Sequence, residues 1–245
     1  MKHPFRKKWG QNFLRDPNII KNIIGCLNIS NKDVIMEIGP GDGALTDQLF
    51  EKVHHIHAIE IDPLLIKKLS EKEYSNVSLY KADILDWDIS NLAEDIKIIG
   101  NLPYYISSVI LVRLLNIQNW KKMVLMFQKE VAKRIISPHG NKSYGRLAIM
   151  CQVYTNVNLE FVVSRDVFEP KPNVDSAIVS FTPKKNNLPD IGPFSQFIKK
   201  AFSHRRKKLK NNFPCTYKSG LLNPWADMRP EELSPSDYIQ LFQRI

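Results

Sequence analysis

The sequence contains few cysteines and no long apolar run. Cys26, Cys151 and Cys215 are scattered through 245 residues without a CxxC pair. Such spacing argues against a disulfide scaffold and a zinc site, so we expect free thiols in a reducing cytoplasm. No stretch reaches the roughly 18 apolar residues of a membrane span, and the start lacks the apolar core of a secretory signal. We therefore expect a cytoplasmic protein without a membrane-spanning segment.

Internal repeats and low-complexity stretches are also missing. Hydrophobic residues make up 43% of the chain and charged residues 24%, which is usual for a globular protein and excludes disorder as the main state. A chain of 245 residues corresponds to one large domain, or to one domain with a smaller companion.

Acidic residues are scarce at both ends of the chain. Residues 1–15 carry a net charge of +5, residues 16–182 carry −2, and residues 183–245 carry +7. Positive flanks on a nearly neutral body suit a polyanionic partner, either nucleic acid or an anionic membrane face. The pattern is also typical of a globular protein with basic tails, so charge alone leaves the partner open.

Apolar runs alternate with amphipathic stretches in the first half of the chain. We expect helices over 44–52, from Pro63, over 107–115 and from Lys129. The runs read as strands at 34–39, 55–62, 77–83, 97–103 and 123–128. Strands rich in Ile and Val that alternate with helices predict an α/β fold, a doubly wound parallel sheet of Rossmann-like type with helices on both faces.

The second half of the chain has a different pattern. A helix is expected over 146–154, followed by strands at 159–163 and 177–181. A polar linker with Pro and Gly follows at 184–193, and short helical segments lie beyond it. We therefore expect a first domain over 1–185 and a small α-helical domain over 186–245.

A glycine-rich loop follows the first strand of the expected sheet. Gly39, Gly41 and Gly43 let a ligand approach the backbone where the strand ends. Glu60 stands 21 residues after Gly39, at the end of the next strand, where a carboxylate can accept both hydroxyls of a ribose. The loop is compatible with a structural turn, a dinucleotide site or another nucleoside cofactor.

Two more acceptors end successive strands, Asp83 the third and Asn101 the fourth. The carboxyl ends of strands in a doubly wound sheet line one crevice. Asp83 can accept the amino group of an adenine. Asp42 brings negative charge to the loop, which disfavours a pyrophosphate. A cofactor with an adenine, a ribose and a zwitterionic tail suits these residues better, and S-adenosylmethionine has all three.

The sequence Asn-Leu-Pro-Tyr at 101–104, the NLPY motif, indicates the reaction. The amino group of adenine is a poor nucleophile because its lone pair is delocalised into the ring. Acceptors from the Asn101 side chain and from the Leu102 or Pro103 carbonyl can localise that lone pair, while Tyr104 offers a face on which an extruded base stacks. The motif favours methyl transfer to nitrogen by positioning, without a strong general base.

With these motifs the chain resembles the small-subunit ribosomal RNA adenine dimethyltransferases, a family that uses S-adenosylmethionine. The resemblance extends over about 8–211 and is carried by nine segments: QNFL (11–14), EIGPGDGALT (37–46), IEID (59–62), DILDW (83–87), NLPYYIS (101–107), QKEVAKRI (128–135), KSYGRLAIMCQVY (142–154), FEPKPNVDSA (168–177) and RRKKLKNNF (205–213). Two positions depart from the family pattern: Tyr105 stands where Asn is more usual, and Asp42 adds a charge to the loop.

The resemblance implies a set of site residues and a substrate. The implied cofactor residues are Asn12, Leu14, Gly39, Glu60, Asp83 and Asn101. Phe168 is implied to sandwich the target adenine together with Tyr104. The implied reaction gives two dimethyladenines at adjacent positions near the 3′ end of small-subunit RNA, late in assembly of the subunit, with S-adenosylhomocysteine as product. We expect the enzyme to act as a monomer on small-subunit ribosomal RNA in a pre-small-subunit particle, without a membrane partner.

Basic residues of the second domain complete the expected sites. On a helix, Arg205 with Lys208 and Arg206 with Lys210 would lie on neighbouring faces and form a wide basic stripe suited to RNA phosphates, although the same run also fits a solvated helix face. We expect Arg205, Arg206, Lys207 and Lys208 to bind the RNA. His55 and His57 share a strand face, but no carboxylate or cysteine completes a ligand set, so we expect no metal.

Three other functions stay open at this point. The first is a large-subunit adenine methyltransferase of the kind that confers antibiotic resistance. The second is a nucleic-acid-binding module that makes little use of its cofactor pocket. The third, a nucleotide-dependent oxidoreductase, is disfavoured by the NLPY motif.

Overall fold

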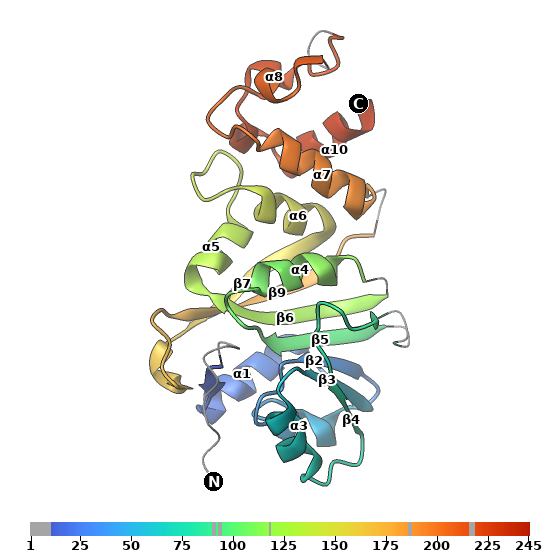
Figure 1. Ribbon diagram of the computed structural model, residues 1–245, viewed down its shortest axis with the longest axis vertical. Helices are drawn as coiled ribbons and strands as arrows, with labels where there is room; N and C mark the ends of the chain where they lie inside the picture. The colour runs from blue at the N-terminus through green and yellow to red at the C-terminus, as the bar shows by residue number, and fades with distance from the viewer. Residues whose placement is uncertain (1–10, 90–91, 93–94, 118, 186–187, 216–218) are drawn as a thin grey trace. The chain divides into compact units, whose positions relative to one another are not determined.

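A computed structural model describes residues 11–245 except 90–91, 93–94, 118, 186–187 and 216–218, so the basic segment 1–10 lies outside the described residues. The main sheet of the protein has seven strands in the order β4-β3-β2-β5-β6-β9-β7 (Figure 1). The strands are β2 (Val34–Ile38), β3 (His55–Glu60), β4 (Val77–Lys81), β5 (Ile96–Asn101), β6 (Trp120–Gln128), β7 (Thr155–Val163) and β9 (Ser176–Pro183).

The strand order gives the sheet its crevice. Strands β4, β3, β2, β5 and β6 are parallel, and β9 runs antiparallel to β6. The chain builds outward from β2 through β3 to β4, then crosses to β5 on the other side of β2. The carboxyl ends of β2 and β5 therefore flank the switch point at which open α/β sheets bind ligands. The predicted α/β, doubly wound fold is confirmed.

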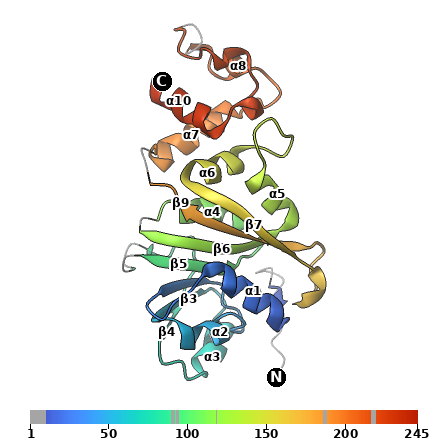
Figure 2. The same cartoon turned by 180° about the vertical axis from the view of Figure 1, so that it is seen from behind.

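Helices pack against both faces of this sheet, as the opposite views of Figures 1 and 2 show. On one face, α1 (Pro17–Leu27) and α2 (Thr46–Leu49) share a buried cluster with alternate residues of the strands, among them Val124 and Met126. The alternate residues Met123 and Leu125 point to the other face, where α4 (Ser107–Leu115) lies.

Helices α1 and α3 begin with the same pair of residues, an aspartate that caps the helix and a proline in its first turn. Asp16 precedes α1 and Asp62 precedes α3 (Pro63–Ser70), and each carboxylate accepts a backbone N–H of the first turn. Proline occupies the first helical position in both, where its missing N–H costs nothing. Helix α1 was not predicted, although its capping residues are visible in the sequence.

A second, two-stranded sheet joins distant parts of the chain. Strand β1 (Phe13–Leu14) runs antiparallel to β8 (Phe168–Glu169), with Leu14 opposite Phe168. Both of these residues are buried in the cluster that α1 shares with the sheet.

The described residues divide into two compact units. One comprises those within Met1–Ala132 and Asn158–Thr182, and the other those within Lys133–Val157 and Pro183–Ile245. The expected boundary near 185 lies close to the division at Thr182, but Lys133–Val157, which we expected in the first domain, belongs to the second unit. The functional division into a methyltransferase and an RNA-binding domain stays a prediction.

The second unit is mainly helical. Buried side chains such as Phe194, Tyr238 and Leu241 form its interior. Its helices are α6 (Arg146–Tyr154), α7 (Ile191–Ala201), α8 (Leu209–Asn212) and α10 (Pro235–Arg244), with 3₁₀ turns at Trp225–Asp227 and Pro230–Glu232; α5 (Lys129–Ile136) crosses the division. Within the part of the chain that the structure describes, every helix is too short or too polar to cross a membrane.

Candidate active site

A cavity opens at the carboxyl ends of β2, β3, β4 and β5. It encloses about 1020 Å³ of space, part of it open to solvent, and it lies within the first unit. Eight of the expected site residues line it: Asn12, Leu14, Gly39, Glu60, Asp83, Asn101, Leu102 and Pro103. The crevice inferred from strand ends is therefore a physical cavity.

The glycine loop adopts backbone conformations that other residues avoid. Gly39, Gly41 and Gly43 all have positive φ, at 66°, 63° and 96°. A Cβ at Gly43 would lie 2.7 Å from the ammonium nitrogen of Lys72, which would have to move, and the φ of 96° would strain any side chain there. The loop can therefore follow the cavity wall closely and bring its backbone to a ligand.

Glu60 is buried at the end of β3 and is held by the backbone. Its two carboxylate oxygens accept the N–H groups of Gly41, at 3.1 Å, and Asp62, at 2.9 Å. Burial raises the pKa of Glu60, while these hydrogen bonds lower it. Each carboxylate oxygen can accept more than one hydrogen bond, so both remain able to accept ribose hydroxyls.

Asp83 and Asn101 are also fixed by backbone contacts. Asp83 accepts the N–H of Leu85 through one oxygen, at 2.9 Å. The side-chain nitrogen of Asn101 donates to the carbonyl of Asn12, at 2.9 Å. Because this contact uses the amide nitrogen, the Asn101 oxygen points the other way, as an acceptor for an amino group.

The segment around β1 forms another wall of the cavity. Gln11 donates from its side chain to Asp62, at 2.8 Å, and Asn12 accepts from Asn101. The ring of Phe13 lies against Gly41, where a Cβ would be 3.2 Å from the ring carbons. These contacts place Asn12 and Leu14 beside the cavity.

Asp42 is paired with two cations of the first unit. Its carboxylate lies 2.5 Å from the guanidinium of Arg15 and 3.7 Å from the ammonium of Lys68. These cations offset the negative charge that Asp42 brings to the loop, so that charge counts less against a pyrophosphate than the sequence alone indicates.

Glu37 is a cavity residue that the sequence analysis did not select. Only 1% of its surface is exposed; one carboxylate oxygen accepts the Thr46 hydroxyl at 2.7 Å, and the other, Oε1, has no hydrogen-bond partner among the described residues. Burial raises the pKa of Glu37 to about 7. The available signal was a single charged residue in the apolar strand VIMEI, directly before the glycine loop.

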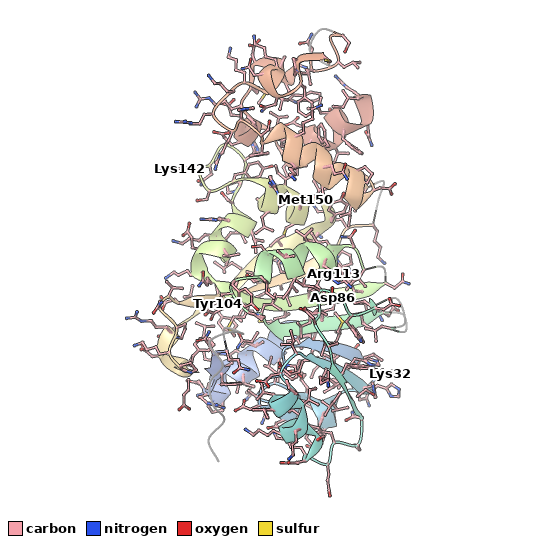
Figure 3. All side chains as sticks on the ribbon, in the orientation of Figure 1. Lys32, Asp86, Tyr104, Arg113, Lys142 and Met150 are labelled. Carbon is pink, nitrogen blue, oxygen red and sulfur yellow. The ribbon has the colours of Figure 1, made fainter. Side chains whose placement is uncertain are left out.

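The two expected stacking residues do not line the cavity. The Tyr104 hydroxyl lies 2.6 Å from the Ser176 hydroxyl (Tyr104 is labelled in Figure 3), and Phe168 is buried opposite Leu14. Tyr105 does line the cavity and is 63% exposed. The sandwich of Tyr104 and Phe168 around an adenine stays a prediction.

The expected basic stripe is not on a helix. Helix α7 ends at Ala201 and α8 begins at Leu209, so Arg205, Arg206, Lys207 and Lys208 lie in the turn between them. Buried Asn212 shapes this turn by donating to the carbonyl of Ala201 at 2.7 Å. Helical spacing is therefore the wrong description of these residues.

Members of this basic turn also differ in their contacts within the second unit. Arg205 donates to the carbonyl of Lys142 at 2.6 Å, and Lys208 pairs with Asp227 at 2.9 Å (Lys142 is labelled in Figure 3). Arg206 and Lys207 are exposed, and the described residues provide neither with an ion pair or a side-chain hydrogen bond. These two cations are best placed to meet phosphates.

The histidines of β3 bond to the neighbouring strand. His55 contacts the Ser78 hydroxyl at 2.9 Å, and His57 contacts the Tyr80 hydroxyl at 3.0 Å. Among the residues with described positions, no group of three or more His, Cys, Asp and Glu side chains could hold a metal ion.

The cavity fits S-adenosylmethionine on the chemistry of its walls. The Glu60 carboxylate can accept the ribose hydroxyls, and the Asp83 carboxylate can accept the adenine amino group. The glycine loop lets the amino-acid tail of the cofactor lie close to the backbone. The partnerless oxygen of Glu37 suits the positive charge that the cofactor carries, since a buried carboxylate is stabilised by an opposite charge.

Known proteins match the chain over nearly its whole length. A model of the family "Ribosomal RNA adenine dimethylase" matches residues 2–245. The "Ribosomal RNA small subunit methyltransferase A" of Legionella pneumophila (strain Corby) is 40% identical over 98% of each chain. The protein of the same name from Pediococcus pentosaceus is 38% identical over 98% of this chain and 89% of the relative.

Solved structures agree with this result. The dimethyladenosine transferase from Plasmodium falciparum has a TM-score of 0.86 and 27% identity, and the match covers 94% of this chain and 95% of that one. The 23S rRNA methyltransferase ErmE has a TM-score of 0.74 and 24% identity, with 95% and 98% covered. The likeness to ErmE shows a shared fold alone.

Proposed function

The chain belongs to the ribosomal RNA adenine dimethylase family, and from this premise we propose that it dimethylates two adjacent adenines near the 3′ end of small-subunit ribosomal RNA. Its relatives named as small-subunit methyltransferases, 38–40% identical over nearly the whole chain, support the small subunit as substrate. The observation that carries the proposal is that Asn101, Leu102 and Pro103 of the NLPY motif line the cavity. The Asn101 nitrogen is engaged by Asn12, and its oxygen, which no described residue contacts by a hydrogen bond, can accept from an adenine amino group.

S-adenosylmethionine supplies the methyl group, as an electrophilic carbon bonded to a sulfonium. Glu60, Asp83 and Glu37 hold the cofactor through its ribose, its adenine and its positively charged part. The walls formed by Asn12 and Leu14 limit its movement and exclude water. Their role is positioning, because a near-attack geometry supplies much of the rate of such a transfer.

The NLPY motif acts on the nucleophile. In the first transfer the Asn101 oxygen and the carbonyl of Leu102 or Pro103 accept the two hydrogens of the amino group and localise the nitrogen lone pair, and in the second transfer one of them accepts the single hydrogen that remains. Each transfer would form an N–C bond as the C–S bond breaks, leave the thioether S-adenosylhomocysteine, and release one proton from the nitrogen to water. The interaction strengthens as that nitrogen becomes tetrahedral, so it stabilises the transition state more than the bound substrate. Tyr104 and Phe168 hold the extruded base by stacking.

The setting of the reaction is also part of the proposal. We infer that the enzyme acts as a monomer on a pre-small-subunit particle in the cytoplasm. The bacterial relatives named for the small subunit support a small-subunit particle as partner and the compartment in which bacterial ribosomes are assembled, whereas the monomer rests on the resemblance alone. Sedimentation of the purified chain, alone and with under-methylated small subunits, tests both the monomer and the particle.

Transfer of tritiated methyl groups tests the substrate. Under-methylated small subunits, large subunits and free RNA are each incubated with the chain and labelled cofactor, and the labelled base is mapped. We expect dimethyladenine at two adjacent positions near the 3′ end of the small-subunit RNA. Label on the large subunit would replace our proposal with the resistance-type activity, and an absence of label would favour a binding module.

A further inference from the structure

The side chains of Tyr104 and Ser176 form a hydrogen bond between two motifs that are far apart in the sequence. Their oxygens are 2.6 Å apart, and 72 residues separate them along the chain. Ser176 is 0% exposed, and burial raises the pKa of Tyr104. The contact is therefore partly shielded from solvent on the side of Ser176, and a hydrogen bond in such a setting is stronger than one at the open surface.

Ser176 is held firmly by its surroundings. It is the first residue of β9 and lies opposite Gln128 of β6. The preceding residue, Asp175, accepts the N–H of Lys129 through its carbonyl at 3.0 Å, and its carboxylate accepts the N–H of Arg165 at 3.3 Å. The sheet and this loop together fix the position of the Ser176 hydroxyl.

Tyr104 is also held at its backbone. The hydroxyl of Ser107, at the start of α4, donates to the Tyr104 carbonyl at 3.1 Å. One serine therefore fixes the main chain of Tyr104 and a second serine, Ser176, fixes the far end of the ring. A side chain anchored at both ends has little rotational freedom left.

We propose that Ser176 is a positioning residue for methyl transfer, whose hydroxyl holds the Tyr104 ring in the orientation that receives the target adenine. The inference rests on the proposed function, since it requires a base to stack on Tyr104. It assigns a role to the tyrosine hydroxyl, which stacking by itself does not require. A ring that is already oriented loses less side-chain freedom when the base binds.

The proposal also explains how the two stacking residues are set relative to each other. Phe168 in β8 and Ser176 in β9 belong to one continuous segment. Through Ser176, this segment holds the Tyr104 ring, and through β8 it carries Phe168. The segment from β8 to β9 therefore positions both rings of the expected base pocket, Phe168 directly and Tyr104 through the hydrogen bond to Ser176.

The test uses Ser176→Ala, Tyr104→Phe and the double variant in the full chain, with under-methylated small subunits as substrate. We expect each single variant to lower kcat about ten-fold at saturating cofactor and RNA, the scale of one hydrogen bond. The KM for RNA and the calorimetric Kd of the cofactor should stay within about two-fold. The double variant should lose no more than either single variant, because all three remove the same bond.

Ser180→Ala is the matched control. Ser180 lies on the same strand and face as Ser176, is 2% exposed, and donates its hydroxyl to Glu160. Its loss should lower the melting temperature without lowering kcat. Tyr104→Ala should reduce kcat much further than Tyr104→Phe, because it removes the ring itself.

Each outcome decides a separate point. Wild-type kcat in both Ser176→Ala and Tyr104→Phe, or losses that add up in the double variant, would overturn the role of Ser176. If Ser176→Ala fails to fold, Tyr104→Phe still removes the bond without altering β9, and its kcat decides the question. A wild-type chain that transfers no methyl group to any ribosomal RNA would instead refute the proposed function.

Discussion

Arg15 and Asp42 form an ion pair that connects the segment following β1 to the glycine loop, with a distance of 2.5 Å between guanidinium and carboxylate. Arg15 also lies 3.6 Å from Glu169 of β8 and 5.3 Å from the ring centroid of Phe13. A single side chain therefore contacts three segments around the cofactor cavity, and the carboxylate that departs from the family pattern has a structural partner.

Replacement of Arg15 by alanine should weaken cofactor binding modestly. Arg15 is partly exposed, so solvent screens the pair, and we expect a loss of about 0.5–1 kcal/mol, or a few-fold in Kd. Calorimetric titration with S-adenosylmethionine measures it, and Lys21→Ala, an exposed position on α1, is the control. The loss should shrink in 0.5 M salt; a loss that salt leaves unchanged would contradict an electrostatic role.

Glu37 should make the stability of the ligand-free protein depend on pH. Its pKa is about 7 in the folded chain and 4.5 when unperturbed, so between these values the folded state holds a proton that the unfolded state releases. The free energy of unfolding should therefore fall as the pH rises from 4.5 to 7, by about 3 kcal/mol from this residue. Urea denaturation across this range measures the slope.

Glu37→Gln isolates that contribution. His55 and His57 have lowered pKa values and act in the opposite direction, so the difference between wild type and variant is the relevant quantity. Parallel pH profiles for wild type and Glu37→Gln would show that the buried carboxylate does not titrate in this range.

Asn101→Ala should reduce methyl transfer far more than RNA binding. The side-chain oxygen is expected to act as the amino nitrogen becomes tetrahedral, so we expect about a 100-fold loss in kcat, by analogy with the removal of one transition-state hydrogen bond elsewhere. The variant also loses the contact with Asn12, so saturation with cofactor must be verified. Asn116→Ala, at the exposed end of α4, is the control, and a saturated Asn101→Ala enzyme with wild-type turnover would disprove the assignment.

The basic turn should contain two kinds of cation. Arg206 and Lys207 are exposed without an ion pair among the described residues, so each alanine variant should lower the salt slope of RNA binding by about 0.7–0.9. Arg205→Ala should change the slope less and reduce stability, because Arg205 holds the Lys142 carbonyl. Filter binding over a salt series separates the two groups; equal slopes in all variants would leave the turn as a solvated surface.

The strands of the sheet could be predicted because each one is marked by the residues within it and directly beside it. Each of the strands β2 to β6 is a short apolar run beside turn residues, and their alternation with helices fixes a parallel arrangement. From this, the meeting of Gly39, Glu60, Asp83 and Asn101 at one cavity followed directly. The prediction needed only the rule that parallel strands end on the same side.

Features that depend on distant contacts were not predictable in the same way. Strands β1 and β8 have two residues each, too few to show a period, and they pair across more than 150 residues. The partners of Asp42 and Tyr104 lie on other segments, so the sequence showed a charge and a hydroxyl without their neighbours. The basic turn was misread because its charges happen to follow helical spacing, while Asn212 stabilises a turn.

The contact between Phe13 and Gly41 limits how the sequence can change over evolutionary time. The ring occupies the space that a side chain at position 41 would need, and the positive φ of Gly41 adds a second barrier. A smaller residue at position 13 would remove only the first barrier, so the two sites should show strong epistasis. In a library that varies both positions together, active variants with a residue other than Gly at position 41 should be rare. Those that occur should also carry a side chain smaller than Phe at position 13.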